Sequence, residues 1–190
     1  MQNHQLDAGH HIQTGTLPAE LILDTAGFDS LWASRPADFH IVHMHGKPVP
    51  TPRWQQAYGK DYVYSGNINR ALPTTATLAP FLAWARERFH DGINSLLLNW
   101  YDGTQGHYIG RHRDATAHMV PDSPIITVSL GEERIFRLRP YGGKGFHDVT
   151  LGHGAVVLIP FATNQRWTHE VPHFKRFTGR RISITLRAFI

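Results

Sequence analysis

The second half of the chain is a succession of short runs rich in β-branched and aromatic residues, and this pattern constrains the fold more than any other feature. Turn sequences such as DGTQG, GGKG and GHG separate the runs. Short strands at this spacing are typical of antiparallel sandwiches and jelly rolls. The sequence therefore predicts a mainly β domain built as a jelly roll, with strands at 95–101, 124–130, 134–139, 155–160 and 182–189.

One amphipathic helix is expected before these strands. Apolar side chains recur at helical spacing between residues 77 and 91, and Gly92 follows them as a stop signal. A lid is expected at about 38–70, where aromatic runs surround the proline-rich segment GKPVPTPRW. Residues 1–15 are expected to form a flexible, histidine-rich tail. The prediction is thus one domain over 16–190, with its catalytic core at about 77–190.

The composition excludes several kinds of chemistry. The chain has 190 residues and no cysteine, which excludes disulfides, thiolate zinc sites and a cysteine nucleophile. A cytoplasmic protein is expected, because cysteine is absent and the first residues lack the features of a signal peptide. No apolar run is long enough to suggest a membrane span. The formal net charge of +4 favours an anionic partner.

Two histidines and one carboxylate could form a metal site. His112 and Asp114 are two residues apart in IGRHRDATAH, so their side chains share one side if the segment is extended. His169, in RWTHEVP, is the best third ligand because it follows a strand that can face the first pair. This ligand set is typical of non-haem Fe(II) oxygenases. Taken singly, the same residues could be a turn pair and a core histidine, and zinc or a metal-free site stays an alternative.

The last strand has two chemically different faces. Arg181, Ser183, Thr185 and Arg187 alternate with three aliphatic residues in RRISITLR. A solvated face is the ordinary explanation of such arginines. If they are buried, the guanidinium groups need anionic partners, and a dicarboxylate cosubstrate would supply them.

These motifs together resemble the AlkB family of Fe(II)/2-oxoglutarate-dependent dioxygenases. The resemblance rests on NWYDGTQGHYIGRHRD, SPIITVSLG, RWTHEVP and RRISITLR, in this order, and covers roughly residues 40–190. The upstream segment MHGKPVPTPRWQQAYGKDYVYSG is similar to the nucleotide-recognition segment of the animal homologues that repair duplex DNA. The resemblance implies a double-stranded β-helix, Fe(II) as cofactor, and 2-oxoglutarate and O2 as cosubstrates.

The resemblance also implies a role for each matching residue. Iron ligands and catalytic residues would be His112, Asp114 and His169. Binding of 2-oxoglutarate would involve Asn99, Tyr101, Arg181, Ser183, Thr185 and Arg187. Substrate contacts would come from Met44, His45, Gly46, Arg53, Tyr62, Tyr64 and Ala115, with Met44–Gly46 as a wedge that fills the gap left by a flipped base. For the two tyrosines, simple strand packing is an equal alternative.

The substrate end departs from the family pattern. Ala115 and Thr116 follow Asp114 where homologues often carry acidic residues, and Ser183 stands where the bacterial member has Asn. Loss of those carboxylates should weaken a preference for cationic bases such as N1-methyladenine or N3-methylcytosine. The wedge is also Met-His rather than aliphatic-aromatic.

Three functions follow in order of preference. The first is oxidative demethylation of N-alkylated bases in DNA, with RNA as an alternative, releasing formaldehyde, succinate and CO2. The second is hydroxylation or demethylation of a protein or small molecule by the same chemistry. The third is a non-catalytic nucleic-acid-binding module. A monomer is expected, located in the cytoplasm, or in the nucleus if the source is eukaryotic.

Overall fold

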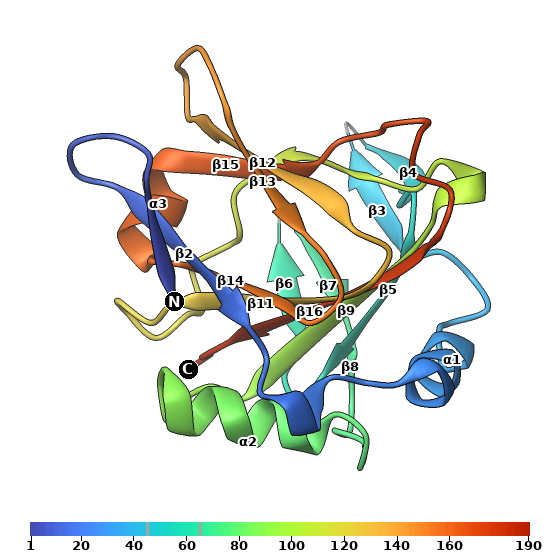
Figure 1. Ribbon diagram of the computed structural model, residues 1–190. Coiled ribbons are helices and arrows are strands. Elements are labelled where there is room, and N and C mark those ends of the chain that lie inside the picture. The colour runs from blue at the N-terminus through green and yellow to red at the C-terminus, as the bar shows by residue number, and fades with distance from the viewer. Residues whose placement is uncertain (45, 65) are drawn as a thin grey trace.

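Two facing β-sheets form the body of the protein (Figure 1). The computed structural model describes residues 1–44, 46–64 and 66–190, apart from the side chain of Met44. The larger sheet has the strand order β1-β2-β14-β11-β16-β9-β5-β8, and the smaller has the order β10-β15-β12-β13. Almost all neighbours in both sheets are antiparallel, the exception being β5 with β8. This architecture confirms the predicted mainly β jelly roll.

The strands have the following bounds. The larger sheet contains β1 (Gln2–Gln5), β2 (His11–Thr16), β5 (Trp54–Tyr58), β8 (Ala71–Leu72), β9 (Ser95–Asp102), β11 (Ile125–Gly131), β14 (Ala155–Ile159) and β16 (Arg180–Arg187). The smaller sheet contains β10 (Ile109–His112), β12 (Arg134–Pro140), β13 (His147–Leu151) and β15 (Trp167–Val171). Two hairpins complete the set, β3 (Ile41–Met44) with β4 (Lys47–Pro50) and β6 (Tyr62–Tyr64) with β7 (Asn67–Asn69).

Strict alternation on β9 and β16 separates the core from the site. Ile182, Ile184 and Leu186 of β16 belong to a cluster between the larger sheet and the helices, together with alternate residues of β9. The residues between them turn to the space enclosed by the two sheets, where a second apolar cluster fills part of the volume. Side chains of successive strand residues point to opposite faces, so polar groups can line this space without disturbing the outer core. The predicted two faces of the last strand are confirmed.

Helices cover the outer face of the larger sheet. Helix α2 (Ala79–Arg88) buries Phe81 and Ala85 against it, and α1 (Thr25–Ala33) buries Phe28, Leu31 and Trp32 in the same cluster. The helix predicted at 77–91 is confirmed, with Pro80 near its start, where the missing N–H costs no hydrogen bond. Helix α1 was not expected from the sequence. Its first turn is capped by the Asp24 carboxylate, which accepts from the Gly27 N–H at 2.8 Å.

The N-terminal segment is not a tail. Residues 2–16 form the β1–β2 hairpin, and β2 extends the larger sheet by pairing with β14. Leu6 and Ile12 are buried, and Trp167 donates from Nε1 to the Asp7 carboxylate at 2.9 Å. The expectation of a flexible tail over 1–15 is therefore wrong, because backbone pairing with a distant strand orders a segment of polar side chains that carries little local signal.

The range 38–70, predicted to be a lid, does not form one structural unit. Within 38–70, the β3–β4 and β6–β7 hairpins stand apart from the two main sheets, whereas β5 lies inside the larger sheet between β8 and β9. The segment 54–58 is therefore part of the core. The remaining elements are the 3-10 turns η1 (Ala19–Leu21) and η2 (Gly103–Gln105), and the helix α3 (Phe161–Arg166), which precedes β15. Across the described residues, no helix is both long and apolar enough to cross a bilayer.

Candidate functional site

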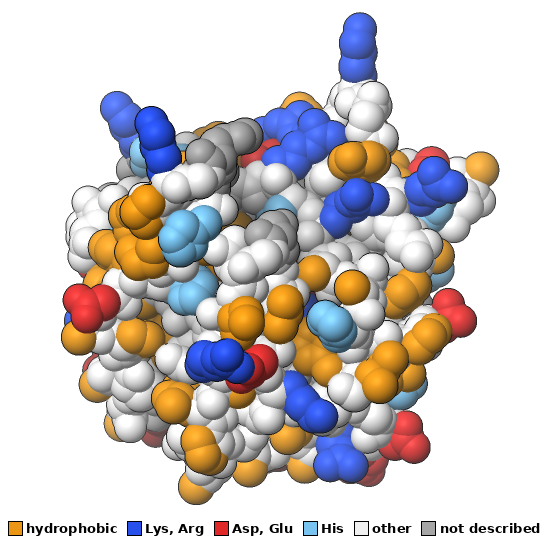
Figure 2. Space-filling view, turned by 180° about the vertical axis from the view of Figure 1, so that it is seen from behind, with side chains coloured by type: hydrophobic (Ala, Val, Ile, Leu, Met, Phe, Trp, Pro, Cys, Tyr) orange, Lys and Arg blue, Asp and Glu red, His pale blue; other side chains and the backbone are white. Residues whose placement is uncertain are grey.

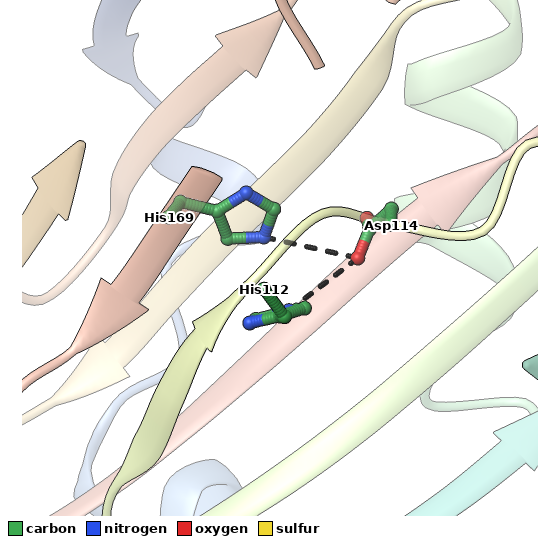
Figure 3. A group of neighbouring side chains, drawn as sticks. All are labelled: His112, Asp114 and His169. Carbon is green, nitrogen blue, oxygen red and sulfur yellow. Dashed lines mark ion pairs between the residues drawn. The ribbon is translucent and has the colours of Figure 1, made fainter. Parts of the chain in front are cut away.

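The structure brings the three predicted metal ligands together. His112 and His169 are direct cross-strand partners on β10 and β15. Their Nε2 atoms lie 3.6 Å and 3.7 Å from the same oxygen of Asp114, Oδ1. Ligand atoms of all three residues lie within 4.8 Å of one another (Figure 3). These three atoms converge on one point from two strands and the loop that follows one of them.

Asp114 reaches this point without being on a strand. Strand β10 ends at His112, so the extended segment assumed from the sequence stops before the carboxylate. Asn164 of α3 fixes the backbone instead, since its Oδ1 accepts from the Asp114 N–H at 2.9 Å and its Nδ2 donates to the Asp114 carbonyl at 3.0 Å. No sequence signal marked Asn164, because it lies 50 residues after Asp114 in the chain and belongs to none of the predicted motifs.

Hydrogen bonding sets the orientation of His112. Its Nδ1 lies 2.8 Å from the Gly110 carbonyl, an acceptor, so this nitrogen carries the proton. The lone pair of Nε2 is then directed toward Asp114 and His169. Such a bond from the distal ring nitrogen is the usual way in which a metal-binding imidazole is oriented.

Burial and charge set the ionisation of the other two groups. Burial and the neighbouring His112 lower the pKa of His169 to about 3, so its ring is neutral at pH 7. Burial opposes ionisation of Asp114, but the Arg187 guanidinium and bonding to His112 outweigh it and hold the pKa of that carboxyl well below its usual range. Neutral imidazole and ionised carboxylate are the forms that bind a cation.

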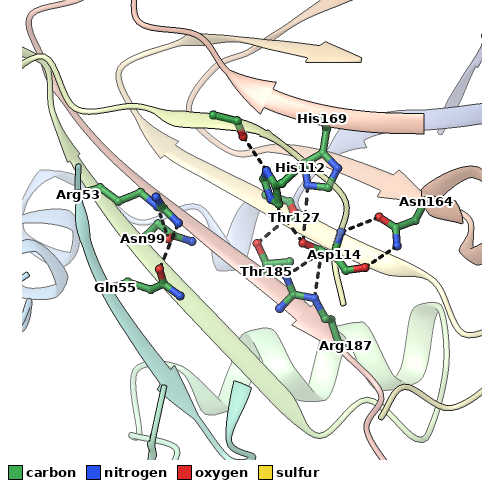
Figure 4. A network of polar contacts seen from close by, with 11 residues as sticks. Arg53, Gln55, Asn99, His112, Asp114, Thr127, Asn164, His169, Thr185 and Arg187 are labelled. Carbon is green, nitrogen blue, oxygen red and sulfur yellow. Dashed lines mark hydrogen bonds and ion pairs between the residues drawn. The ribbon is translucent and has the colours of Figure 1, made fainter. Parts of the chain in front are cut away.

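A cavity of about 880 Å³ opens beside these ligands. Asp114 forms one side of it with Thr127, Thr185 and Arg187, and Arg53, Gln55 and Asn99 form the other (Figure 4). All six residues expected to bind 2-oxoglutarate line this cavity: Asn99, Tyr101, Arg181, Ser183, Thr185 and Arg187. The prediction that the polar face of the last strand lines a cavity is therefore confirmed.

Two arginines in this cavity are buried and have unused donors. Arg181 is 1% exposed and donates from Nε to the Ser129 hydroxyl at 2.9 Å, but its Nη1 has no partner among the described residues. Arg187 donates from Nε and Nη2 to Asp114 Oδ2 at 3.0 Å and 2.7 Å, and its Nη1 is likewise without a partner in the described part of the chain. Buried guanidinium donors of this kind suit a carboxylate ligand.

The donor set and the cavity fit the cofactors implied by the motifs. Two imidazoles and one carboxylate beside an open cavity suit non-haem Fe(II). Arg181 and its unpaired Nη1 suit one end of a dicarboxylate. The residues present are therefore compatible with Fe(II) and 2-oxoglutarate.

The substrate residues are only partly brought to the cavity. Arg53, Tyr62, Tyr64 and Ala115 line it, and the Tyr62 and Tyr64 rings stack with centroids 5.0 Å apart. Gly46 lies at the turn between β3 and β4 with φ of 77° and does not line the cavity. The prediction that Met44 and His45 form a wedge lies outside the described part of the structure, which lacks His45 and the side chain of Met44.

Comparison with known proteins agrees with this geometry. The family model described as the 2OG-Fe(II) oxygenase superfamily matches residues 28–187. The chain belongs to this superfamily. Fe(II), 2-oxoglutarate and O2 are thus the cofactor and cosubstrates, as the sequence predicted.

Individual relatives of this oxygenase are AlkB homologues. It is 30% identical to the DNA oxidative demethylase ALKBH2 of Bos taurus over 164 residues, which cover 78% of this chain and 57% of that protein. It is also 30% identical to ALKBH2 of Homo sapiens, with 78% of this chain and 61% of the relative covered. The oxygenase spans about three fifths of the length of these relatives. The solved structure of OsALKBH1 aligns over 98% of this chain and 99% of its own, with a TM-score of 0.59 and 12% identity, which supports the fold.

Proposed function

We propose that this oxygenase removes alkyl groups from the ring nitrogens of nucleobases, acting on DNA, with RNA as the alternative. The observation that carries the proposal is the convergence of His112, Asp114 and His169 at the wall of a cavity that also contains an unpaired buried arginine and two stacked tyrosines. The names of the relatives, DNA oxidative demethylases, support DNA as the substrate.

In this proposal each residue has a defined task. His112, Asp114 and His169 hold Fe(II), which supplies oxidation of a C–H bond by O2 when it is bound. Arg181 and Thr185 bind and orient 2-oxoglutarate, and Arg187 keeps Asp114 ionised and fixed in direction. Tyr62 and Tyr64 would hold the base, because aromatic rings gain about 1–3 kcal/mol from a stacked base.

Positive charge around the cavity supports a nucleic-acid substrate. Arg111 and Arg113 line the cavity and are exposed, and the Arg113 guanidinium lies 3.9 Å from the ring centroid of Tyr141. Tyr141 is itself 62% exposed, so an aromatic ring and two cations are available together. In Figure 2, lysine and arginine side chains gather along the upper edge of the face shown. Phosphate groups are the expected partners of such a rim.

The decisive experiment measures formaldehyde and repaired base together from a methylated oligonucleotide, with Fe(II), 2-oxoglutarate and O2 present. The expected result is equal amounts of both products, and their loss in Asp114→Ala. Asp91→Ala is the matched control, since the Asp91 side chain is fully exposed and outside the site. Full turnover by Asp114→Ala would contradict the assignment of the ligands.

Two further points stay predictions: that the protein is a monomer and that it works in the cytoplasm, or in the nucleus of a eukaryote. Sedimentation of the purified chain at several concentrations tests the first. Imaging of the tagged protein in its own cells tests the second.

A further inference from the structure

The cavity contains far more positive than negative charge. Among the described residues, its charged lining consists of one acid, Asp114, and five arginines, which are Arg53, Arg111, Arg113, Arg181 and Arg187. Asp114 is already engaged by Arg187 at 2.7 Å and lies beside His112 and His169. No carboxylate therefore remains in this lining to meet a cationic substrate.

Arg53 is the unusual member of this set. It is 7% exposed and donates from Nε to Asn99 Oδ1 at 2.7 Å and from Nη2 to Gln55 Oε1 at 3.1 Å. It has no ion pair within the described ranges, and His45 and Ser65, which lie outside those ranges, have no carboxylate. A buried cation held only by neutral amides is stabilised by any further acceptor that enters the cavity.

Arg53 lines the same cavity as Tyr62 and Tyr64, the two residues proposed to hold the base. Arg53, Gln55 and Tyr64 line the same cavity, and Gln55 accepts from Arg53. Nη1 of Arg53 makes no hydrogen bond to a described residue, so it can donate to a ligand that enters the cavity shared with Tyr64. Guanidinium and amide N–H groups match carbonyl oxygens and repel cations.

We infer that, if the proposed function holds, this oxygenase prefers neutral N-methylated bases that carry ring carbonyls, such as N3-methylthymine and N1-methylguanine. In these bases the methyl group replaces a ring N–H proton, so the base stays uncharged and a carbonyl adjoins the methylated nitrogen. In N1-methyladenine and N3-methylcytosine the methyl group instead leaves the base with a positive charge. Arg53 favours binding of the neutral bases and disfavours binding of the cationic bases. Ala115 has no carboxylate that could stabilise a cationic base instead.

The reaction balances for a neutral base. The N-methyl group, O2 and 2-oxoglutarate give an N-hydroxymethyl group, succinate and CO2, with one oxygen atom entering succinate and the other the methyl C–H bond. The N-hydroxymethyl group then loses formaldehyde as its hydroxyl proton returns to the ring nitrogen. Oxidation of 2-oxoglutarate and of the methyl carbon together reduces O2 fully.

The test compares four single-stranded oligonucleotides that differ only in the modified base: N3-methylthymine, N1-methylguanine, N1-methyladenine or N3-methylcytosine. We expect kcat/KM for the neutral pair to exceed that for the cationic pair by about tenfold or more, since one like charge in a partly buried site has at least this effect. Faster repair of the cationic pair would overturn the inference alone. Absence of formaldehyde from all four, with 2-oxoglutarate still bound, would overturn the proposed function.

Two matched variant pairs locate the preference. Ala115→Asp should lower the neutral-to-cationic ratio of kcat/KM by about tenfold, whereas the isosteric, uncharged Ala115→Asn should leave it near the wild-type ratio. Arg53→Gln should lower the same ratio and Arg53→Lys should retain most of it. A ratio is used because Arg53 also contacts Asn99, and weaker cosubstrate binding would affect all four substrates alike. An equal ratio in Ala115→Asp and Ala115→Asn, or in Arg53→Gln and wild type, would contradict this assignment.

Discussion

Two nitrogens of the Arg187 guanidinium donate to one carboxylate oxygen of Asp114, and both side chains are only 3% exposed. Arg187 is on β16 of the larger sheet, and Asp114 follows β10 of the smaller sheet. The pair therefore links the two sheets at the point where the three candidate ligands meet. It leaves Asp114 Oδ1 facing both histidines, because Arg187 occupies only Oδ2.

Removal of this guanidinium should destabilise the fold. We expect Arg187→Met to lower the free energy of unfolding by about 3–5 kcal/mol, because Asp114 is left as an unpaired buried charge. The matched control is Arg180→Met on the same strand, whose pair with Asp29 is 46% and 50% exposed. That pair should contribute about 0–1 kcal/mol. Urea unfolding measures both, and equal losses in the two variants would contradict the linking role of Arg187.

Asn164 should matter for the metal rather than for the substrate. Asn164→Ala removes both hydrogen bonds to the Asp114 backbone, so the carboxylate loses its direction. We expect Fe(II) affinity to fall by about 10–100-fold, as for other residues that orient a ligand. Arg166→Ala on the same helix is the control. Isothermal titration without oxygen gives the affinities, and wild-type affinity in Asn164→Ala would show that the loop holds Asp114 by itself.

The N-terminal hairpin should be acid-sensitive through Asp7. Hydrogen bonds from the Gly9 backbone, Trp167 and His10 lower the pKa of Asp7 to about 2. A carboxyl with a lowered folded-state pKa adds stability above its unfolded pKa, and this contribution is lost as pH falls from about 4 through about 2. Asp7→Asn should therefore be less stable than wild type near neutral pH, and the difference should shrink toward about pH 2. Urea unfolding over that range measures it, and a difference independent of pH would refute the assignment.

Nucleic-acid binding should depend on salt through the cationic rim. Log affinity should fall linearly with log salt concentration, and Arg113→Ala should reduce the slope by about 1 if that side chain contacts one phosphate. Arg86→Ala, on α2 at the outer face of the larger sheet, should leave the slope unchanged. Fluorescence anisotropy in the Asp114→Ala background separates binding from turnover. Equal slopes for the Asp114→Ala protein alone, with Arg113→Ala and with Arg86→Ala would show that Arg113 does not contact a phosphate.

The inner face of the last strand was readable because β16 alternates strictly between polar and apolar residues from Arg181 to Arg187. That alternation reports burial on one face and a cavity on the other, and the structure has both. The position of His169 beside His112 was also predicted from the sequence, because His169 follows the strand AVVLIP where a facing strand would pass, and the structure pairs the two residues.

Other features carried no such signal. The β1–β2 hairpin is polar and is ordered by pairing with β14, a contact between distant parts of the chain. Asn164, on a helix 50 residues after Asp114, bonds to the Asp114 backbone. Arg53 meets Asn99 only because strands β5 and β9 are neighbours in the sheet. Long-range contacts of this kind are not encoded in local periodicity.

The central claim is that His112, Asp114 and His169 hold Fe(II) with 2-oxoglutarate bound beside it. Adding both to the purified protein without oxygen should produce a visible metal-to-ligand absorption band, and Asp114→Ala should lack it while Asp91→Ala retains it. A folded wild-type protein that gives no band under these conditions would contradict the account of this site.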